Sequence, residues 1–215
     1  MHSMPPVAHP PQRNIPLLRD YQVACVNHVT AAVDNGEQSI IFSLPTSTGK
    51  GVIIGRLAEE FSARGRVLVI VHRHEIVEQL ADHCRTFCDP VGVVMANRDE
   101  VSNPIIVASV QTLHPKRLQR LIDASPVPIA TLLIDEAHHA TAASYRKLMD
   151  RLRNAYPNLA VVGCTATPFR ADKDDLHAVF GAMVFERTIP DMQAAGWLAL
   201  TTYERVVVPL HLADM

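Results

Sequence analysis

Residues 44–51 read LPTSTGKG, and they lie between an apolar run, QSIIFSL, and a segment with helical spacing, VIIGRLAEEFSA. A strand, a loop of small residues and a helix in this order direct backbone N–H groups and a helix N-terminus toward a bound anion. The strict phosphate-loop pattern fails at both ends, because Leu44 replaces its first glycine and Gly51 its final Ser or Thr. The eight residues alone fit a simple turn equally well. Their setting predicts a phosphate loop in which Lys50 reaches the β- and γ-phosphates of a nucleotide.

The apolar runs of the chain predict the fold class. Runs that are apolar throughout suit strands buried on both faces, and their alternation with helical patterns favours a parallel sheet covered by helices on both sides. Ligands of such sheets bind beyond the carboxyl ends of the strands. The segments that directly follow strands, HRHE, SVQT, DEAHH and TATPFR, are therefore candidates for the site together with the loop. The predicted strands are QSIIFSL, RVLVIV, VGVVM, PIIVAS, ATLLID and LAVVGC.

Composition limits the possible functions. The 215 residues, with 48% hydrophobic content, predict one folded domain that starts near Ile15, after a flexible proline-rich tail over residues 1–14. A net charge of −2 excludes a protein that binds nucleic acid by bulk charge alone. Four cysteines without a secretory start predict a reducing, cytoplasmic location. No apolar run approaches the ~18 residues that span a bilayer, so no membrane partner is expected.

The segment LLIDEAHHA carries the clearest chemistry. Two adjacent carboxylates after a buried run are costly to desolvate unless they meet a cation or transfer protons. Asp135 is the candidate for holding Mg²⁺ through water, and Glu136 for orienting and deprotonating an attacking water. His138 is a candidate for coupling the γ-phosphate to the neighbouring strand end, whereas His139 is expected to face solvent. An acidic helix N-cap is the alternative interpretation of the two carboxylates.

Three further features have a structural and a functional interpretation. His83, Cys84 and Cys88 lie on one predicted helix, where a metal site is conceivable but packing is favoured. Residues 115–120, PKRLQR, fit a solvated helix face, with phosphate contact as the alternative. Trp197 is expected to be a packing anchor, not a platform for stacking bases.

Six segments in one order closely resemble the first RecA-like motor domain of superfamily 2 helicases. The subgroup is similar to the DEAH-type helicases related to XPB and to type I or III restriction subunits, and the resemblance extends roughly over residues 17–200. It implies an α/β RecA-like P-loop domain over residues 15–200, with a mostly parallel sheet, helices on both faces, and ATP and Mg²⁺ as cofactors. The segments are LRDYQ, PTSTGKG, VHRHEIVEQ, VASVQTL, LIDEAHHA and GCTATPFR.

The resemblance also implies roles for individual residues. Asp135 and Glu136 match the positions that hold the metal and the attacking water. Nucleic-acid backbone contacts of this kind use hydroxyls and a few basic groups, so they need no large positive charge. Arg19 and Gln22 match the positions that contact adenine, and Thr165 and Thr167 match the motif that couples hydrolysis to strand movement. The nucleic-acid backbone is contacted at the positions of Arg73, Gln111 and Thr112. The nucleotide phosphates are bound at the positions of Thr46, Ser47, Thr48, Gly49, Lys50 and Gly51.

The chain departs from the family pattern at two loop positions, Ser47 and Gly51, and it lacks the sequence of a second RecA-like domain. The family usually has Gly at Ser47 and Thr or Ser at Gly51, so water must replace a hydroxyl at the metal and Asp135 becomes its main tether. On this basis Gly51→Thr is expected to tighten Mg²⁺-dependent ATP binding. Residues 201–215 resemble the strand and linker toward a second RecA-like domain, which is expected as a partner in cis or in trans.

Two classes of function follow from these features. The first is the N-terminal motor domain of an ATP-dependent helicase or translocase, with nucleic acid as its track and DNA favoured over RNA. The second is a non-catalytic nucleic-acid-binding or interaction module, either a decayed ATPase or one half of a split motor. Gly51 and the absent second half favour the module, whereas Lys50, Asp135 and Glu136 favour the enzyme.

Overall fold

A computed structural model describes residues 15–167 and 173–201. The predicted tail, residues 1–14, lies outside the described residues, as do residues 202–215 of the predicted strand and linker and residues 168–170 of TATPFR. Within the described ranges, no helix is both long and apolar enough to cross a membrane.

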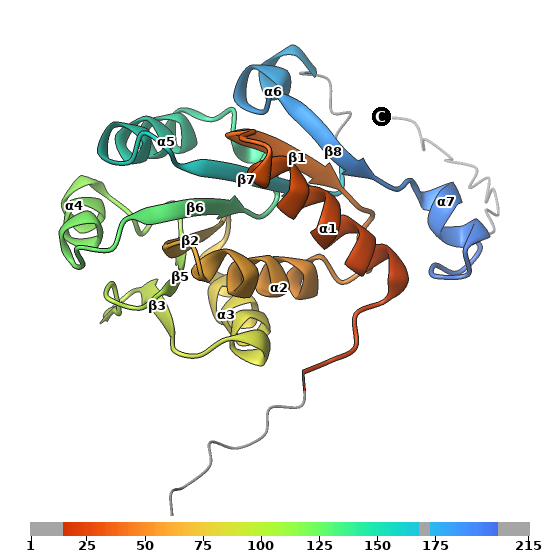
Figure 1. The fold of residues 1–215 in the computed structure, drawn as a ribbon, viewed down its shortest axis with the longest axis horizontal. Coiled ribbons are helices and arrows are strands. Elements are labelled where there is room, and N and C mark those ends of the chain that lie inside the picture. The colour runs from red at the N-terminus through yellow and green to blue at the C-terminus, as the bar shows by residue number, and fades with distance from the viewer. Residues whose placement is uncertain (1–14, 168–172, 202–215) are drawn as a thin grey trace, which may run out of the picture.

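The described residues form one eight-stranded sheet in the order β4-β3-β5-β2-β6-β7-β1-β8 (Figure 1). All neighbouring strands are parallel except β3 and β4. The predicted α/β fold with a mostly parallel sheet is therefore confirmed, and each of the six predicted runs forms a strand. The strands are β1 (Ser39–Ser43), β2 (Arg66–Val71), β3 (Val91–Met95), β4 (Arg98–Asp99), β5 (Ile105–Ser109), β6 (Ile129–Ile134), β7 (Ala160–Thr165) and β8 (Ala182–Glu186).

Helices cover both faces of the sheet. The buried side chains of α1, α2 and α3 form one core with β1 and β2, and those of α4 and α5 form a second core on the opposite face. Figure 1 shows these two layers on either side of the strands. The helices are α1 (Asp20–Asp34), α2 (Lys50–Ser62), α3 (Val77–Phe87), α4 (Pro115–Asp123), α5 (Ala143–Ala155), α6 (Lys173–Val179) and α7 (Ile189–Ala194), with short 3-10 helices η1 (His74–Ile76) and η2 (Ala137–His139).

In the central strand β2, residues 67–71 are all apolar because both faces of the sheet are covered. Successive side chains of a strand point to opposite faces of the sheet. Val67, Val69 and Val71 enter the core beneath α1–α3. Leu68 and Ile70 enter the core beneath α4 and α5. Because both faces are covered, no position in this stretch of β2 favours a polar side chain.

The parallel register brings the ends of five strands to one edge of the sheet. Ser43 at the end of β1 pairs with Thr165 at the end of β7. Val71 at the end of β2 pairs with Ser109 at the end of β5. β6 lies between β2 and β7 and ends at Ile134. The segments predicted to carry chemistry therefore leave the sheet at the same edge, where ligands of such folds bind.

Candidate active site

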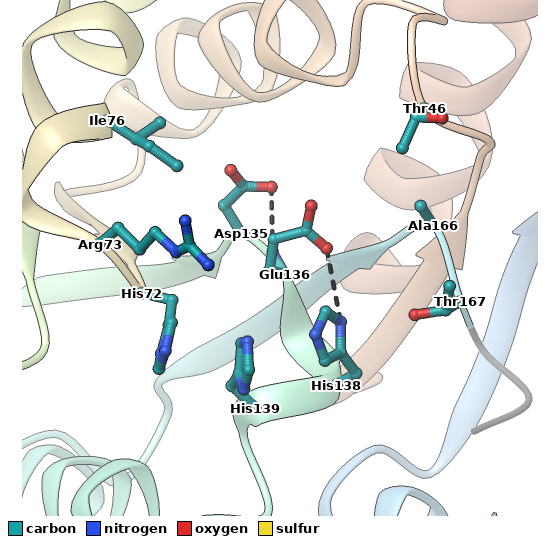
Figure 2. Close-up of a pocket in the computed structure, with 10 residues that line it drawn as sticks. All are labelled: Thr46, His72, Arg73, Ile76, Asp135, Glu136, His138, His139, Ala166 and Thr167. Atoms are coloured by element: carbon teal, nitrogen blue, oxygen red, sulfur yellow. Dashed lines mark hydrogen bonds and ion pairs between the residues drawn. The ribbon is translucent and has the colours of Figure 1, made fainter. Parts of the chain in front are cut away.

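A pocket of about 450 Å³ lies at this edge (Figure 2). Its walls come from the phosphate loop, from the segments after β2 and β6, and from the end of β7. The structure thus brings together side chains that lie far apart in the sequence. The pocket is lined by Thr46, His72, Arg73, Ile76, Asp135, Glu136, His138, His139, Ala166 and Thr167.

The phosphate loop depends on left-handed backbone conformations. Gly49 has φ 76° as the N-cap of α2, and Ser47 has φ 65°. Glycine adopts this region without penalty, whereas a side chain at Ser47 makes it strained. The left-handed backbone at Ser47 explains why the family usually has a glycine at this position. Lys50 Nζ donates hydrogen bonds to the carbonyls of Leu44 and Pro45, both at 3.3 Å, so its ammonium group lies against the loop.

The loop is fastened to α1 through Thr48, which is fully buried. Its hydroxyl donates to the Pro45 carbonyl at 2.7 Å, and its own carbonyl accepts from Tyr21 Oη at 2.7 Å and Gln22 Nε2 at 3.2 Å. Gln22 Oε1 accepts from the Arg19 backbone N–H at 2.9 Å. The Gln22 amide thus holds the loop with its nitrogen and caps the start of α1 with its oxygen. Its predicted adenine contact, like that of Arg19, stays a prediction.

The two carboxylates follow β6 and lie on the same side of the pocket (Figure 2). Asp135 Oδ1 accepts from the Glu136 backbone N–H at 3.0 Å. Burial raises the pKa of Asp135 above its usual range, the Glu136 carboxylate raises it further, and the Lys50 charge opposes both effects. Glu136 has φ 50°, a left-handed conformation that non-glycine residues adopt mainly at functional sites.

His138 joins Glu136 to the neighbouring strand β7. Its Nδ1 lies 3.4 Å from Glu136 Oε2 and 3.3 Å from Thr165 Oγ1. Thr165 Oγ1 also accepts from the Thr167 backbone N–H at 3.1 Å, and the Thr165 carbonyl accepts from Leu44 N at 3.0 Å. This network connects the segment after β6, the end of β7 and the phosphate loop.

The expectation that His139 faces solvent is wrong. Its side chain is half-buried, and its ring stacks on that of His72, with centroids 3.7 Å apart and planes 15° from parallel. The two rings meet because β2 and β6 are adjacent parallel strands and both histidines follow the strand ends. The signal of this contact was a histidine directly after β2 and another at the end of η2, five residues after β6. The strand order needed to use this signal is not visible in the sequence.

The residues predicted to contact nucleic acid lie after β2 and β5. Gln111 Nε2 donates to the His72 carbonyl at 2.7 Å, and the hydroxyl of Thr112 lies 2.6 Å from that of Ser109. Arg73 is exposed and points into the pocket on the side of Asp135 (Figure 2). Arg73 thus shares a pocket with the carboxylates, as the position of HRHE and DEAHH after two strands predicted.

The residues present fit a nucleotide with its divalent cation. Asp135 and Glu136 offer hard carboxylate oxygens, which Mg²⁺ prefers, beside a loop with a lysine. The space beside Gly51 is not free, however: a Cβ atom added there would lie 2.5 Å from His83 Cδ2. While His83 is present, Gly51→Thr is therefore not expected to tighten Mg²⁺-dependent ATP binding. The threonine side chain would displace the imidazole.

The three other features of the sequence have clear positions. Cys84 is fully buried in the core beneath α1–α3 and Cys88 packs against that core, so the packing interpretation is confirmed for both. In α4, Arg117 Nε and Arg120 Nη2 pair with Asp99 at 3.0 and 2.8 Å. The single carboxylate of Asp99 thus offsets part of the positive charge of these two groups.

Trp197 packs as predicted, although 38% of it remains exposed. Its ring meets that of Tyr21 edge-on, with centroids 5.4 Å apart. The guanidinium of Arg19 lies 5.3 Å from the centroid of the same ring, within the range of a cation–π contact. Trp197 thus packs against the segment that contains Arg19 and Gln22.

Comparison with known proteins decides the family. Residues 15–170 match the family described as type III restriction enzyme, res subunit. The chain belongs to this family. It is also 33% identical over 214 residues to the putative ATP-dependent helicase IRC3 of Saccharomyces cerevisiae, a match that covers 93% of this chain and 30% of the relative. Together with the fold, these matches identify the N-terminal RecA-like domain of a superfamily 2 helicase.

Solved structures of the same fold agree with this assignment. The helicase domain of Hef from Pyrococcus furiosus has a TM-score of 0.65 and 22% identity over 82% of this chain and 39% of its own. A nuclease-deletion mutant of the type ISP restriction-modification enzyme LlaGI, in complex with a DNA substrate mimic, has a TM-score of 0.66 and 15% identity over 85% of this chain and 21% of its own. The res-family chain spans less than a third of the length of the curated relatives that it matches here.

Asp135→Asn is expected to stabilise the domain at neutral pH. Because folding raises the pKa of Asp135, the folded state binds more protons, and the free energy of unfolding falls as pH rises from the unfolded to the folded pKa. Asparagine keeps the acceptor for the Glu136 N–H and carries no charge, so we expect a gain of about 0.5–2 kcal/mol. Urea unfolding at pH 7.5 measures this gain in the free energy of unfolding. The variant Asp150→Asn, at an exposed position on α5, is the control. The gain should vanish below the unfolded pKa; a gain that persists there would contradict this explanation.

Proposed function

We propose that this chain binds ATP with Mg²⁺ at the carboxyl edge of its sheet and acts as the N-terminal motor domain of an ATP-dependent helicase or translocase. The observation that carries the proposal is the meeting of a lysine-bearing phosphate loop with the adjacent carboxylates of Asp135 and Glu136. The network through His138 and Thr165 adds a connection between this site and the neighbouring strand ends. The family matches to ATP-dependent helicases favour this proposal over the non-catalytic alternative.

Each residue has a distinct role in this proposal. The hydrogen bonds of Lys50 to two loop carbonyls are long, at 3.3 Å, so its ammonium group can exchange them for the β- and γ-phosphates. Asp135 would hold the cation through water, and Glu136 would orient an attacking water and accept its proton. The bound Mg²⁺ supplies charge neutralisation at the phosphates.

A second RecA-like domain, in cis or in trans, would complete the motor. Closure of two domains on one nucleotide drives strand movement in such motors, and an arginine finger from the second domain is worth ~10³ to 10⁵ in rate. This chain alone should therefore hydrolyse ATP slowly and should not unwind a duplex. Robust unwinding by residues 1–215 alone would refute the requirement for a second RecA-like domain.

We propose DNA as the track, held mainly by its phosphates. The similar fold of LlaGI bound to a DNA substrate mimic supports DNA over RNA. Three residues, Arg73, Gln111 and Thr112, follow adjacent strands and present one charge, one amide and one hydroxyl group. Groups of these types contact phosphates and read no base sequence.

Arg73→Ala is expected to weaken DNA binding about 5- to 10-fold for every sequence, because it removes one phosphate contact worth about 1 kcal/mol. The slope of log affinity against log salt should also become shallower by about 0.7 to 0.9. Fluorescence anisotropy with two unrelated labelled oligonucleotides at several salt concentrations measures both effects. Lys147→Ala, which removes an exposed charge on α5, is the control; binding confined to one sequence, or indifferent to salt, would count against the proposal.

The protein is expected to work in a reducing compartment, and we retain the cytoplasm as the prediction. Cys25, Cys84 and Cys164 are buried as free thiols, and burial raises the pKa of each. Buried, protonated thiols are unreactive, so these cysteines are structural.

Nucleic-acid-stimulated ATP hydrolysis tests the proposed function. The rate should be low for the chain alone and should rise on addition of DNA when a second RecA-like domain is joined to it. An unchanged rate in all combinations, with DNA still bound, would instead support the non-catalytic module.

A further inference from the structure

Helices α2 and α3 approach each other closely along two glycines of α2 that are one turn apart. A Cβ atom at Gly55 would lie 2.6 Å from the carbonyl oxygen of His83 and 3.1 Å from Phe87 Cδ2. The backbones of the two helices are thus in direct contact at Gly55, which fixes the position of His83 relative to the start of α2. This start is the phosphate loop, since α2 begins at Lys50.

The ring of His83 fills the space that a side chain at Gly51 would occupy. From the position of an added Cβ at Gly51, His83 Cδ2 lies at 2.5 Å, Nε2 at 2.9 Å and Cγ at 3.3 Å. The Cα–Cβ direction is the direction in which the Thr or Ser of the usual pattern leaves the helix. A polar atom of His83, Nε2, therefore lies beside the place from which that hydroxyl would extend.

The His83 ring is available for a ligand. Its side chain is half-buried, and within residues 15–167 and 173–201 its nitrogens have no hydrogen-bond or ion-pair partner. A neutral imidazole nitrogen offers a lone pair, as a hydroxyl oxygen does, and can accept a hydrogen bond from water or bind a metal ion. The ring thus replaces the missing hydroxyl in chemistry as well as in space.

We propose that His83 contributes a nitrogen to the divalent cation of the bound nucleotide and substitutes for the hydroxyl that Gly51 lacks. This inference rests on the proposed function, because it requires a nucleotide in the loop. Asp135 and Glu136 provide oxygens, and His83 adds a nitrogen from a different element. Since imidazole suits Mn²⁺ better than it suits Mg²⁺, the site should use Mn²⁺ at least as well as Mg²⁺.

Gly51 and His83 should therefore behave as a coupled pair. His83→Ala is expected to reduce the metal-dependent part of nucleotide affinity by about 10-fold, the lower end of the losses caused by removing a group that supports a metal site. Gly51→Thr alone should not improve affinity, because its side chain meets the imidazole. The double variant Gly51→Thr/His83→Ala should regain the loss and should prefer Mg²⁺ over Mn²⁺, since an oxygen then replaces the nitrogen.

Calorimetric titration of ADP in MgCl₂, in MnCl₂ and in EDTA tests the inference on residues 1–215. His83→Phe separates packing from chemistry, because it keeps a ring beside Gly51 and removes both nitrogens. We expect His83→Phe to lose metal-dependent affinity as His83→Ala does, with thermal melting to show that each variant folds. His28→Ala, which replaces an exposed histidine on α1, is the control.

The possible outcomes separate this inference from the proposed function. Wild-type metal dependence in both His83→Ala and His83→Phe, while Lys50→Ala abolishes binding, would overturn the role of His83 and leave the nucleotide site standing. No saturable ADP binding by the wild-type chain with either metal would overturn both. A loss in both His83 variants, with rescue by the double variant, supports the pair.

Discussion

Lys50→Ala is expected to lower the affinity for ADP and Mg²⁺ by about 100-fold. A hydrogen bond to a charged group is worth up to about 3 kcal/mol, which corresponds to about a factor of 100 in the dissociation constant. Among the described residues, Nζ bonds only to the loop carbonyls of Leu44 and Pro45, both at 3.3 Å. The folded state therefore loses little when these weak contacts disappear, and the effect should fall on nucleotide binding.

Isothermal titration calorimetry measures this loss directly, and thermal melting without nucleotide checks the fold. Lys147→Ala, which removes the same charge from an exposed position on α5, should bind as the wild type does. Normal ADP binding by Lys50→Ala would remove the assignment of LPTSTGKG as a phosphate loop.

Glu136→Gln is expected to reduce the rate of ATP hydrolysis by about 10²- to 10⁴-fold, the usual contribution of a general base. Glutamine has nearly the shape of glutamate and can keep the same backbone conformation, but it cannot accept the proton of the attacking water. The contact of His138 Nδ1 with Glu136 Oε2 at 3.4 Å can persist with the amide oxygen. The variant should therefore hydrolyse ATP slowly and bind it normally.

Single-turnover hydrolysis with a second RecA-like domain joined to the chain measures the chemical step. Glu75→Gln, at an exposed position in η1, is a matched control that removes a nearby carboxylate outside the pocket. An unchanged rate in Glu136→Gln would assign the proton transfer to another group. A large loss of ATP affinity would instead indicate a structural role.

The fold was predictable because its strands are apolar on both faces. β2 after Arg66 is apolar throughout, and β6 is apolar except for Thr131, since helices cover both sides of the sheet. β8 was missed: it lies at the sheet edge, where only Phe185 is buried, and its apolar run is short. β4 has two residues, too few for any periodic pattern.

The positions of the main site residues were also predictable, because parallel strands bring their carboxyl ends to one edge. Lys50, Asp135 and Glu136 needed only this rule and the order of the motifs. The backbone strain at Ser47 and Glu136 was not predictable, because neither side chain signals a left-handed conformation.

Contacts between elements remained hidden in the sequence. The stack of His72 on His139 depends on β2 lying beside β6, and the insertion of His83 beside Gly51 depends on how closely α3 approaches α2. In the sequence, Gly51 showed only that the usual metal-binding hydroxyl is missing, and His83 showed only that a histidine lies on a predicted helix. Only the distance between them shows that one fills the place of the other.

Hydrogen–deuterium exchange of the wild-type chain, with and without a non-hydrolysable ATP analogue and Mg²⁺, tests the central claim most directly. If the chain is a nucleotide-driven motor domain, amides in residues 44–54 and 134–139 should become protected together, and omission of Mg²⁺ should weaken that protection. Peptides from the opposite edge, such as residues 124–130 before β6, should exchange unchanged. Unaltered exchange at residues 44–54 with saturating analogue and Mg²⁺ would contradict the claim.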